Sequence, residues 1–304
     1  MRSDNFQVIV STDQPLCQQE LRACRPSLTS YPTTFAIAFS LVHVLLAVFI
    51  ACISFGWQEI RIRYDNVCES GQKCTLEFNT SFTLNPPVYI YYELDGFIQN
   101  HYRFRQSIDY KQLSGQYVTD GAKCEPKVNF NNSSTIMAPC GLRAYYTWTD
   151  VYTMPDSWDA VTKNITWEHE IGNLYRELSD KYTDSQRWMK SIPEYEDEVM
   201  SDKFAIWMRT SPRPHFKKLY ARLNGPVKAG SHKIDVDLNF GKDIYSGKRY
   251  IVMNTLSKAG GRNLTLIGVN IFIGFVYVIG ALISSIATYR SSHSNDSSVR
   301  KLSF

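Results

Sequence analysis

The sequence lacks the short motifs that mark common enzyme and transport sites. It has no Gly-x-x-x-x-Gly-Lys-Ser/Thr phosphate loop, no Gly-x-Ser-x-Gly turn, no His-Glu-x-x-His zinc motif and no dinucleotide fingerprint. The nearest approach to a catalytic or metal cluster is Glu168-His169-Glu170. Alternating side chains in one short stretch point in different directions, which favours a solvated surface. We therefore expect a protein that is not an enzyme and that uses no metal or cofactor.

Charge is absent from two long stretches, residues 35–55 and 264–289. A bilayer core about 30 Å thick needs about 20 apolar helical residues, so each stretch is long enough to span it. The first lies some thirty residues into the chain and has no small-residue cleavage pattern after it, unlike a removable signal peptide. A buried core helix is the alternative for each stretch. We expect two spans, with both termini on one side of the membrane.

The spans contain few polar side chains. His43 and Asn270 are the strongly polar ones, and a lone neutral side chain of this kind more often bonds a neighbouring helix than marks a transport path. Small residues are expected to give the second span a close-packing face; they are Gly268, Gly274, Gly280 and Ala281.

Orientation cannot be read from positive charge, because Lys and Arg flank both sides of the spans almost equally. Six Asn-x-Ser/Thr sequons are present, and five lie between the spans, which favours a lumenal or extracellular position for that region. Asn263 is close to the membrane and Asn295 would be cytosolic. The candidate glycosylation sites are therefore Asn79, Asn131, Asn132 and Asn164. The predicted organisation is a cytosolic arm (1–34), a span (35–56), an ectodomain (57–263), a second span (264–289) and a cytosolic tail (290–304).

Four cysteines lie between the spans, and no two of them form a Cys-x-x-Cys unit, which disfavours a zinc site. An even number in an oxidising compartment indicates two disulfides. Pairing nearest neighbours gives Cys68 with Cys74 and Cys124 with Cys140, although three connectivities are formally possible.

Alternation of apolar and polar residues predicts a strand-rich ectodomain of the antiparallel β-sandwich type with inserted helices. Strands are expected between 76 and 84, over 88–92 and over 234–240, with 249–256 as the hairpin partner of 234–240. Leu174, Leu178 and Tyr182 have near-helical spacing, which predicts a surface helix within 171–189.

Several motifs in the chain resemble those of one family. Tyr92-Glu-Leu94 is followed by Phe97, Gln99-Asn100-His101, Arg103, Ser107 and Gln112-Leu113. Ala138-Pro-Cys-Gly141 comes next, then Phe204-Ala-Ile-Trp207-Met208-Arg209-Thr210, and finally Gly247-Lys-Arg249 and Gly260-Gly261. In this order they resemble the cell-division-cycle 50 family, the accessory beta subunits of type IV P-type ATPase phospholipid flippases. The resemblance covers almost the whole chain. Many relatives have four cysteines in the first disulfide region, where this chain has two.

The resemblance implies an obligate heterodimer with the catalytic alpha subunit of such an ATPase. The partner would carry the catalytic aspartate and move phospholipid, while this subunit supports folding, export from the endoplasmic reticulum and activity. Trp207, Phe97 and Tyr91 are interpreted as ectodomain core, and Arg209, Arg103 and His101 as holders of internal hydrogen bonds. We expect the edge of residues 85–113 to contact the partner.

Two other classes share parts of this pattern. A two-span channel subunit has the same topology, but it would line a pore with polar residues and carry more disulfides. A membrane-anchored glycan-binding or glycan-processing protein is the other, because a carboxylate pair for glycoside hydrolysis is spatial and leaves no local motif.

Overall fold

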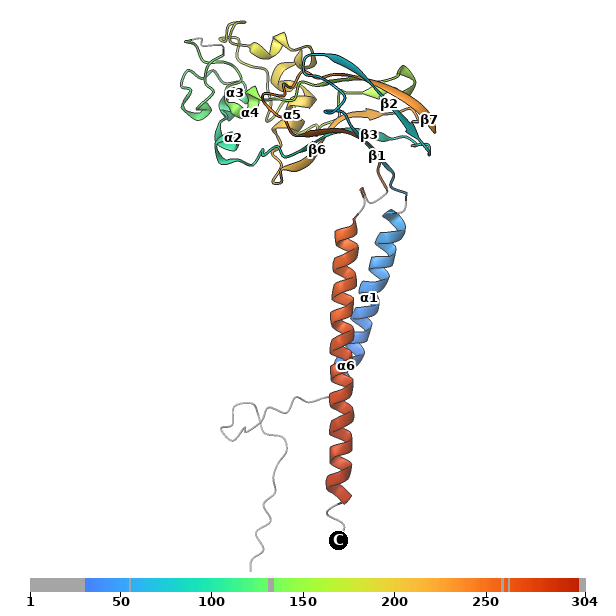
Figure 1. Ribbon diagram of the computed structural model, residues 1–304. Helices are drawn as coiled ribbons and strands as arrows, with labels where there is room; N and C mark the ends of the chain where they lie inside the picture. The colour runs from blue at the N-terminus through green and yellow to red at the C-terminus, as the bar shows by residue number, and fades with distance from the viewer. Residues whose placement is uncertain (1–30, 55, 131–133, 258–259, 262, 301–304) are drawn as a thin grey trace, which may run out of the picture. The chain divides into compact units, whose positions relative to one another are not determined.

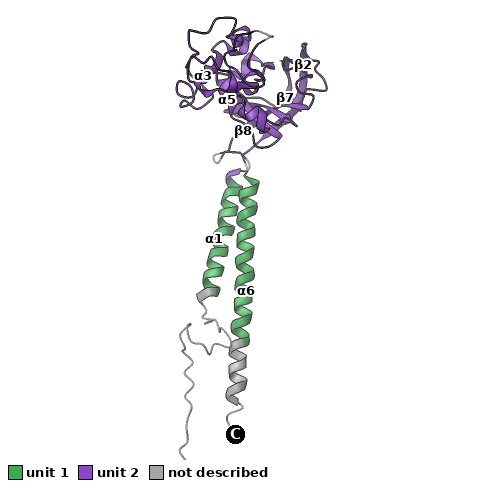
Figure 2. Ribbon diagram, turned by 90° about the vertical axis from the view of Figure 1, so that its left-hand side faces the viewer, with its two compact units in different colours: residues 1–52, 263–304 green, residues 53–262 purple. Residues whose placement is uncertain are grey.

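The computed structural model describes residues 31–54, 56–130, 134–257, 260–261 and 263–300. Residues 1–30 of the predicted arm and the sequons at Asn131 and Asn132 lie outside this part of the chain. The protein divides into two compact units, Met1–Cys52 with Asn263–Phe304, and Ile53–Arg262, which Figure 2 colours separately. We call the second unit the central domain.

The described residues of the first unit belong to two long helices, α1 (Tyr31–Ser54) and α6 (Leu264–Arg300). Within them, Thr33–Ser54 and Leu264–Arg290 are each long and apolar enough to cross a membrane. Most large apolar side chains of both helices are exposed. Exposed apolar surface of this extent is incompatible with water and is the surface that a bilayer or another membrane helix covers.

Polar and small residues join α1 to α6, as the sequence predicted for His43 and Asn270. The Nδ1 atom of His43 lies 3.0 Å from Oδ1 of Asn270, and Asn270 is buried. A Cβ atom at Gly274 would lie 3.5 Å from the backbone oxygen of Ser40, so the two backbones approach closely there. A Cβ at Gly268 would meet nothing within 4 Å. The same holds for Gly280, so the predicted close-packing face includes Gly274 but neither Gly268 nor Gly280.

The central domain contains two antiparallel sheets (Figure 1). The five-stranded sheet has the order β1-β8-β3-β6-β5, and the three-stranded sheet has the order β2-β7-β4. The strands are β1 (Glu59–Arg63), β2 (Lys73–Thr80), β3 (Val88–Asp95), β4 (Val151–Thr153), β5 (Ala160–Val161), β6 (His215–Leu223), β7 (Gly230–Asp237) and β8 (Lys248–Thr255).

Side chains from both sheets form one hydrophobic core, so the predicted antiparallel, β-rich fold is confirmed. Ile90 in the larger sheet and Ile234 in the smaller one are both fully buried members of this core. The rings of Tyr152 in β4 and Tyr220 in β6 meet edge to face with centroids 4.5 Å apart, which joins the sheets directly. β3 lies between β8 and β6, and it ends where Gly96 takes a φ of +107°.

The long connections between strands carry short helices, which lie at one end of the sheets in both views (Figures 1 and 2). The α-helices are α2 (Tyr102–Gln106), α3 (Tyr110–Leu113), α4 (Leu142–Tyr145) and α5 (Asp202–Met208). The 3-10 turns are η1 (Ala122–Cys124), η2 (Asp156–Trp158), η3 (Trp188–Ser191), η4 (Pro193–Tyr195) and η5 (Glu198–Met200).

The prediction of a surface helix within 171–189 is wrong. The segment is irregular apart from the start of η3, and Leu174, which was expected to share a face with Leu178, is 54% exposed while Leu178 is buried. Local side-chain bonds replace helical ones: Asn173 donates to the carbonyl of His169, and Thr183 bonds Gln186. Such bonds compete with the backbone ladder of a helix.

The predicted hairpin between 234–240 and 249–256 is also wrong. Both segments are strands, but β7 pairs with β2 and β4, whereas β8 pairs with β1 and β3. The connection between them folds around the buried side chain of Arg249, whose guanidinium donates to the carbonyls of Phe240 at 2.5 Å and Tyr245 at 2.6 Å. This arrangement passes the chain from one sheet to the other.

Candidate functional site

The Phe204–Thr210 motif forms α5 and the turn after it. Ser201 precedes the helix with extended dihedrals, and Asp202 places a negative charge in its first turn, which the helix dipole favours. The last five residues of the helix are all buried. Because water is excluded from this end of the helix, its final carbonyl groups must find donors in the protein.

Two buried cations supply donors at the C-terminus of α5. Lys218 of β6 donates to the carbonyls of Ile206, at 3.2 Å, and Arg209. Arg143 of α4 donates to the carbonyl of Met208. Positive charge is the sign that a helix C-terminus favours. Burial and the two neighbouring guanidinium groups lower the pKa of Lys218 to about 7.

Gln99 completes the set, which we call the α5 cap: Gln99, Arg143 and Lys218. Its amide nitrogen lies 3.5 Å from the carbonyl of Trp207, and its amide oxygen accepts from the backbone N–H of Ser211 at 3.0 Å. Gln99 is fully buried. The predicted motif around residues 97–113 and the predicted motif around 204–210 therefore meet in one polar junction.

Aromatic packing surrounds this junction. The indole N–H of Trp207 donates to the carbonyl of Arg143 at 3.0 Å, and the Trp207 side chain is fully buried. Phe97 is partly buried and packs on Trp207 with ring centroids 5.5 Å apart. It meets four further rings edge to face, those of Phe104, Phe216, Phe240 and Tyr245. Trp207 and Phe97 belong to the core, as the sequence predicted, whereas Tyr91 is half-buried and lies outside it.

Arg209 extends the junction toward the surface. Its guanidinium pairs with Glu170 and donates to the hydroxyl of Thr166, and it lies 4.8 Å from the ring centroid of Trp167. Burial alone would raise the pKa of the Glu170 carboxyl, but hydrogen bonds from Arg209 and Thr166 outweigh it and lower that pKa. Arg209 therefore holds internal hydrogen bonds, as predicted.

The same motif region also holds the second disulfide. Ser107 donates to the carbonyl of Cys124 at 2.7 Å, and the amide oxygen of Gln112 accepts from the backbone N–H of Cys140 at 2.8 Å. Cys124 and Cys140 form a disulfide, and Cys68 pairs with Cys74. Both are nearest-neighbour pairings. The polar residues of the 97–113 stretch thus fasten the Ala138–Gly141 loop to the rest of the domain.

Other predicted motif residues lie elsewhere. Asn100, His101 and Arg103 are exposed, so the interpretation of His101 and Arg103 as internal hydrogen-bond holders is wrong. Thr210 is half-buried directly after Arg209. Gly260 and Gly261 belong to a separate turn at the end of β8, where Gly260 has a φ of +86° and exchanges two backbone hydrogen bonds with Ser257. The sequence motifs did not indicate Arg143 or Lys218 as site residues.

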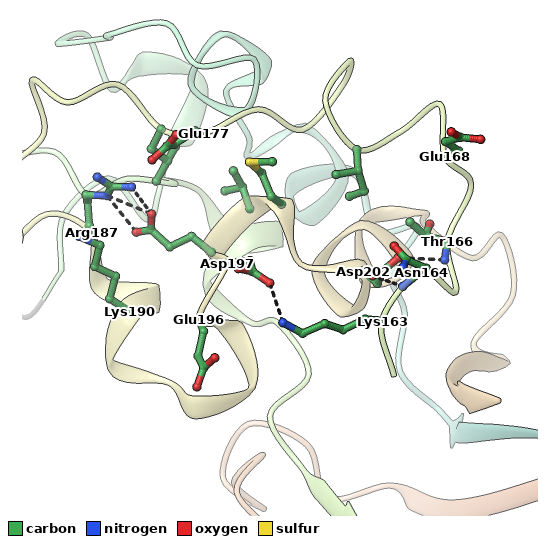
Figure 3. Close-up of a pocket in the computed structure, with 15 residues that line it drawn as sticks. Lys163, Asn164, Thr166, Glu168, Glu177, Arg187, Lys190, Glu196, Asp197 and Asp202 are labelled. Atoms are coloured by element: carbon green, nitrogen blue, oxygen red, sulfur yellow. Dashed lines mark hydrogen bonds and ion pairs between the residues drawn. The ribbon is translucent and has the colours of Figure 1, made fainter. Parts of the chain in front are cut away.

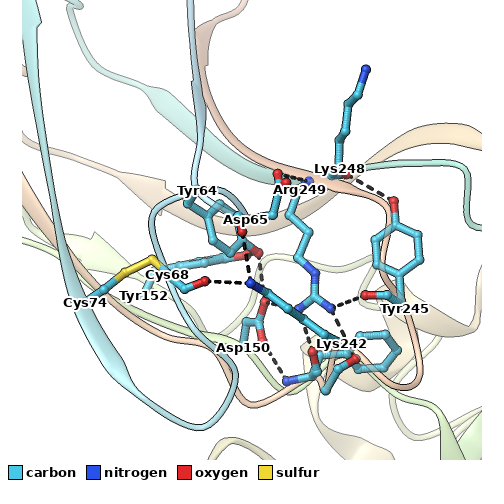
Figure 4. A network of polar contacts seen from close by, with 12 residues as sticks. Tyr64, Asp65, Cys68, Cys74, Asp150, Tyr152, Lys242, Tyr245, Lys248 and Arg249 are labelled. Atoms are coloured by element: carbon cyan, nitrogen blue, oxygen red, sulfur yellow. Dashed lines mark hydrogen bonds and ion pairs between the residues drawn. A yellow bond between two sulfur atoms is a disulfide. The ribbon is translucent and has the colours of Figure 1, made fainter.

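A second buried network lies between the two sheets (Figure 4). The Arg249 Nη1 atom is 3.2 Å from Asp150 Oδ2, which also accepts from the hydroxyl of Tyr64 at 2.8 Å. The Tyr64 hydroxyl lies 2.9 Å from that of Tyr152 in β4. The Gly247-Lys-Arg249 motif was visible in the sequence, but nothing there indicated Asp150 as its partner.

A surface cleft adjoins α5 (Figure 3). It encloses about 1040 Å³ and has a floor of Ile171, Leu178, Val199 and Met200. Charged residues dominate its rim; they are Lys163, Glu168, Glu177, Arg187, Lys190, Glu196, Asp197, Glu198 and Asp202. Arg187 and Glu198 form a buried ion pair there. Among the residues that the structure describes, no group of three His, Cys, Asp or Glu side chains could hold a metal ion.

The model of the LEM3 (ligand-effect modulator 3) family, also called the CDC50 family, matches residues 18–294. The chain belongs to the CDC50 family. The match includes both hydrophobic helices and the complete central domain. The α5 cap, the Cys124–Cys140 disulfide and the Asp150–Arg249 pair are thus parts of a CDC50-family domain.

Individual members are similar over most of their length. The chain is 29% identical to ALA-interacting subunit 3 of Arabidopsis thaliana over 88% of this chain and 84% of that protein. It is 27% identical to cell cycle control protein 50C of Macaca fascicularis over 90% of each chain. A third relative is the phospholipid-transporting ATPase accessory subunit CDC50 of Chaetomium thermophilum, at 29% identity over 68% of this chain and 57% of that protein.

The geometry of this CDC50-family domain is that of a scaffold. Its buried polar motif side chains bond backbone groups or one another in the interior, as the α5 cap does at four carbonyl groups. Groups engaged in this way fix the relative positions of the strands and loops. The exposed surface that they support, which includes the motif residues Asn100, His101 and Arg103, is then available to a partner.

Proposed function

We propose that this chain is the non-catalytic accessory subunit of a phospholipid-transporting P-type ATPase. The observation that carries the proposal is the CDC50-family match across residues 18–294, together with a relative that is named as such a subunit. The two apolar helices and the compact central domain support it, because an accessory subunit must offer a membrane surface and a folded surface outside the membrane.

In this proposal the catalytic subunit carries the aspartate that is phosphorylated and moves phospholipid to the cytoplasmic leaflet. The accessory chain binds the folded ATPase and not the unfolded one. Binding of this kind raises the stability of the ATPase by mass action, which explains how the accessory subunit would support folding and export from the endoplasmic reticulum.

The proposed topology places both termini in the cytosol and the central domain in the lumen or outside the cell. Two disulfides in the central domain support this placement, because such bonds persist in oxidising compartments. The proposed organisation keeps the arm at 1–34, the ectodomain at 57–263 and the tail at 290–304. Asn79 and Asn164 are exposed and are proposed to carry glycans, as are Asn131 and Asn132.

We place the partner contact on the exposed edge around α2. Ile98 and Tyr102 are 58% and 65% exposed, and Asn100, His101 and Arg103 lie beside them in the sequence, also exposed. Exposed apolar side chains interspersed with polar ones are typical of a protein–protein contact. The buried Gln99 holds this edge to α5, so its shape is set before a partner arrives.

Co-purification tests the proposal. The full chain, co-expressed with a P-type lipid ATPase of the same cell and extracted in mild detergent, should be isolated with that ATPase. Ile98→Asp with Tyr102→Asp should weaken the association at least about tenfold, because charge would be buried in the contact. Val67→Asp is the matched control, since Val67 is 60% exposed on the connection after β1. Isolation of the chain alone or as a homo-oligomer would contradict the proposed function.

A further inference from the structure

We propose that the cleft beside α5 is a carbohydrate site and that its occupant is an N-linked glycan carried on Asn164 of the same chain. This inference rests on the lumenal placement of the central domain in the proposed function. It goes further by assigning a ligand class to the cleft and a structural role to one sequon.

The sequon forms part of the cleft wall. Lys163, Asn164 and Thr166 line one side, opposite residues 196–200 (Figure 3). Asn164 is exposed and has a φ of +56°, a left-handed conformation that Asn tolerates better than most residues. A glycan attached at this position would begin at the rim of the cleft.

The backbone of the sequon is held in place. The carboxylate of Asp202 accepts from the N–H of Asn164 at 2.9 Å through Oδ2 and from the N–H of Thr166 at 3.0 Å through Oδ1. Asp202 is the first residue of α5, whose other end carries the α5 cap. The point of attachment is therefore fixed to the most buried helix of the domain, and the first sugar would have a defined position.

The lining suits a neutral, hydroxyl-rich ligand. Ile171 and Met200, which are half-buried in the lining, can pack against the apolar faces of sugar rings, and the charged lining residues offer carboxylates and ammonium groups to hydroxyl and acetamide groups. Lys163 and Asp197 pair at 3.5 Å while 76% and 59% exposed, so this weak pair can exchange for bonds to a ligand.

The volume agrees with a ligand of several sugars. The volume of about 1040 Å³ lies just above the usual range of roughly 300–1,000 Å³ for small-molecule sites. A cationic segment of a partner is the competing occupant, because Glu168, Glu177 and Glu196 add negative charge to the rim. The sequon among the lining residues favours the glycan, because a glycan attached to Asn164 would be held at the cleft by a covalent bond.

Asn164→Gln is the variant that isolates the glycan. Thr166 also belongs to the sequon, but its hydroxyl donates to Glu170 at 2.7 Å and accepts from Arg209, so its loss would disturb the protein as well. Asn79→Gln is the matched control. Asn79 is exposed on β2, in the other sheet from the β5 strand that precedes the Asn164 sequon.

The experiment measures glycan occupancy by glycopeptide mass spectrometry, and then hydrogen exchange, on the full chain co-expressed with its ATPase in eukaryotic cells. Asn79 and Asn164 should both be occupied. Asn164→Gln should then speed exchange in peptides covering 196–202 by about threefold or more, because the backbone there loses its cover, while Asn79→Gln leaves them unchanged.

The outcomes separate this inference from the proposed function. Glycan on Asn79 without glycan on Asn164 overturns the inference and leaves the lumenal placement intact. Absence of glycan from every sequon overturns the placement itself. An occupied Asn164 whose removal leaves exchange at 196–202 unchanged shows a glycan that points to solvent, which also overturns the inference. Protection of 196–202 that depends on the ATPase instead assigns the cleft to a protein segment.

Discussion

The guanidinium of Arg249 and the carboxylate of Asp150 form an ion pair inside the central domain, with Nη1 and Oδ2 3.2 Å apart and the side chains 1% and 0% exposed. Arg249 belongs to β8 of the larger sheet, and Asp150 directly precedes β4 of the smaller one. The pair therefore joins the two sheets at the place where the chain crosses from one to the other.

Removal of one member of this pair should be far more damaging than removal of both. Arg249→Met leaves the Asp150 carboxylate buried without its counter-charge, and such changes cost about 3–5 kcal/mol. Arg249→Met with Asp150→Leu leaves no buried charge, so it should lose less stability than Arg249→Met alone. Thermal unfolding of the purified chain in mild detergent measures Arg249→Met, Asp150→Leu and the double variant. A double variant as unstable as the sum of the two single variants would show that the charges are not coupled.

Loss of the Cys124–Cys140 disulfide should destabilise the domain by about 2–5 kcal/mol and retain the chain in the endoplasmic reticulum. Cys68→Ala should act in the same direction but less strongly, because its bond closes a loop with a sequence separation of 6 rather than 16. Cys52→Ala is the control, since Cys52 is a free cysteine in α1. Unfolding curves and the fraction of mature glycoprotein report the result, and equal behaviour of Cys124→Ala and Cys52→Ala would refute the structural role.

Sequence alone predicted the features that depend on local pattern. Absence of charge over 35–55 and 264–289 indicated two long helices. Alternation of apolar and polar residues at 234–240 indicated a strand, because successive side chains of a strand point to opposite faces. Strand pairing does not follow from alternation of apolar and polar residues. The sequence predicted β8 as the partner of β7, yet β8 pairs with β1 and β3, because the buried Arg249 directs the chain between β7 and β8.

The candidate site divides in the same way. Its motifs were visible, but the contacts between them were not, since Gln99 meets Trp207 across more than a hundred residues. His101 and Arg103 were assigned to the interior because their motif also contains buried residues, yet α2 is a single short helix with no buried residue. The cleft has no sequence signature, because its lining comes from separate loops, 3-10 turns and the first residue of α5, which lie far apart in the sequence.

Titration of Lys218 should make stability depend on pH above neutrality. Its pKa is lowered to about 7 in the folded protein, whereas an unfolded lysine keeps the ordinary value of 10.5. Between these values the unfolded chain binds one more proton, so the contribution of Lys218 to stability rises with pH by up to about 1.4 kcal/mol per unit, and it is constant below about pH 7.

Lys218→Met removes this titration while keeping an apolar stem of similar length. Unfolding measurements between pH 6 and 9 give the stability of the native chain minus that of the variant. This difference should be constant up to about pH 7 and should increase above it. Other titrating groups, such as Lys203, are present in both proteins and cancel in the difference. A difference that stays constant across this range would show that Lys218 titrates outside it.

The last prediction concerns the two hydrophobic helices. A side chain at Gly274 would contact the Ser40 carbonyl and the Val44 side chain, each at 3.5 Å from its Cβ, so Gly274→Leu should force α6 away from α1. The hydrogen bond between His43 and Asn270, one turn of α6 earlier, would be lost with it, at a further cost of about 0.6 kcal/mol.

Gly268→Leu is the matched control, because a Cβ there meets nothing within 4 Å. Purified without its partner, the Gly274 variant should unfold at a lower temperature and be cut faster by protease within the spans, while the Gly268 variant behaves as the native chain. Equal behaviour of the two variants would mean that α1 and α6 do not hold each other in the absence of the ATPase.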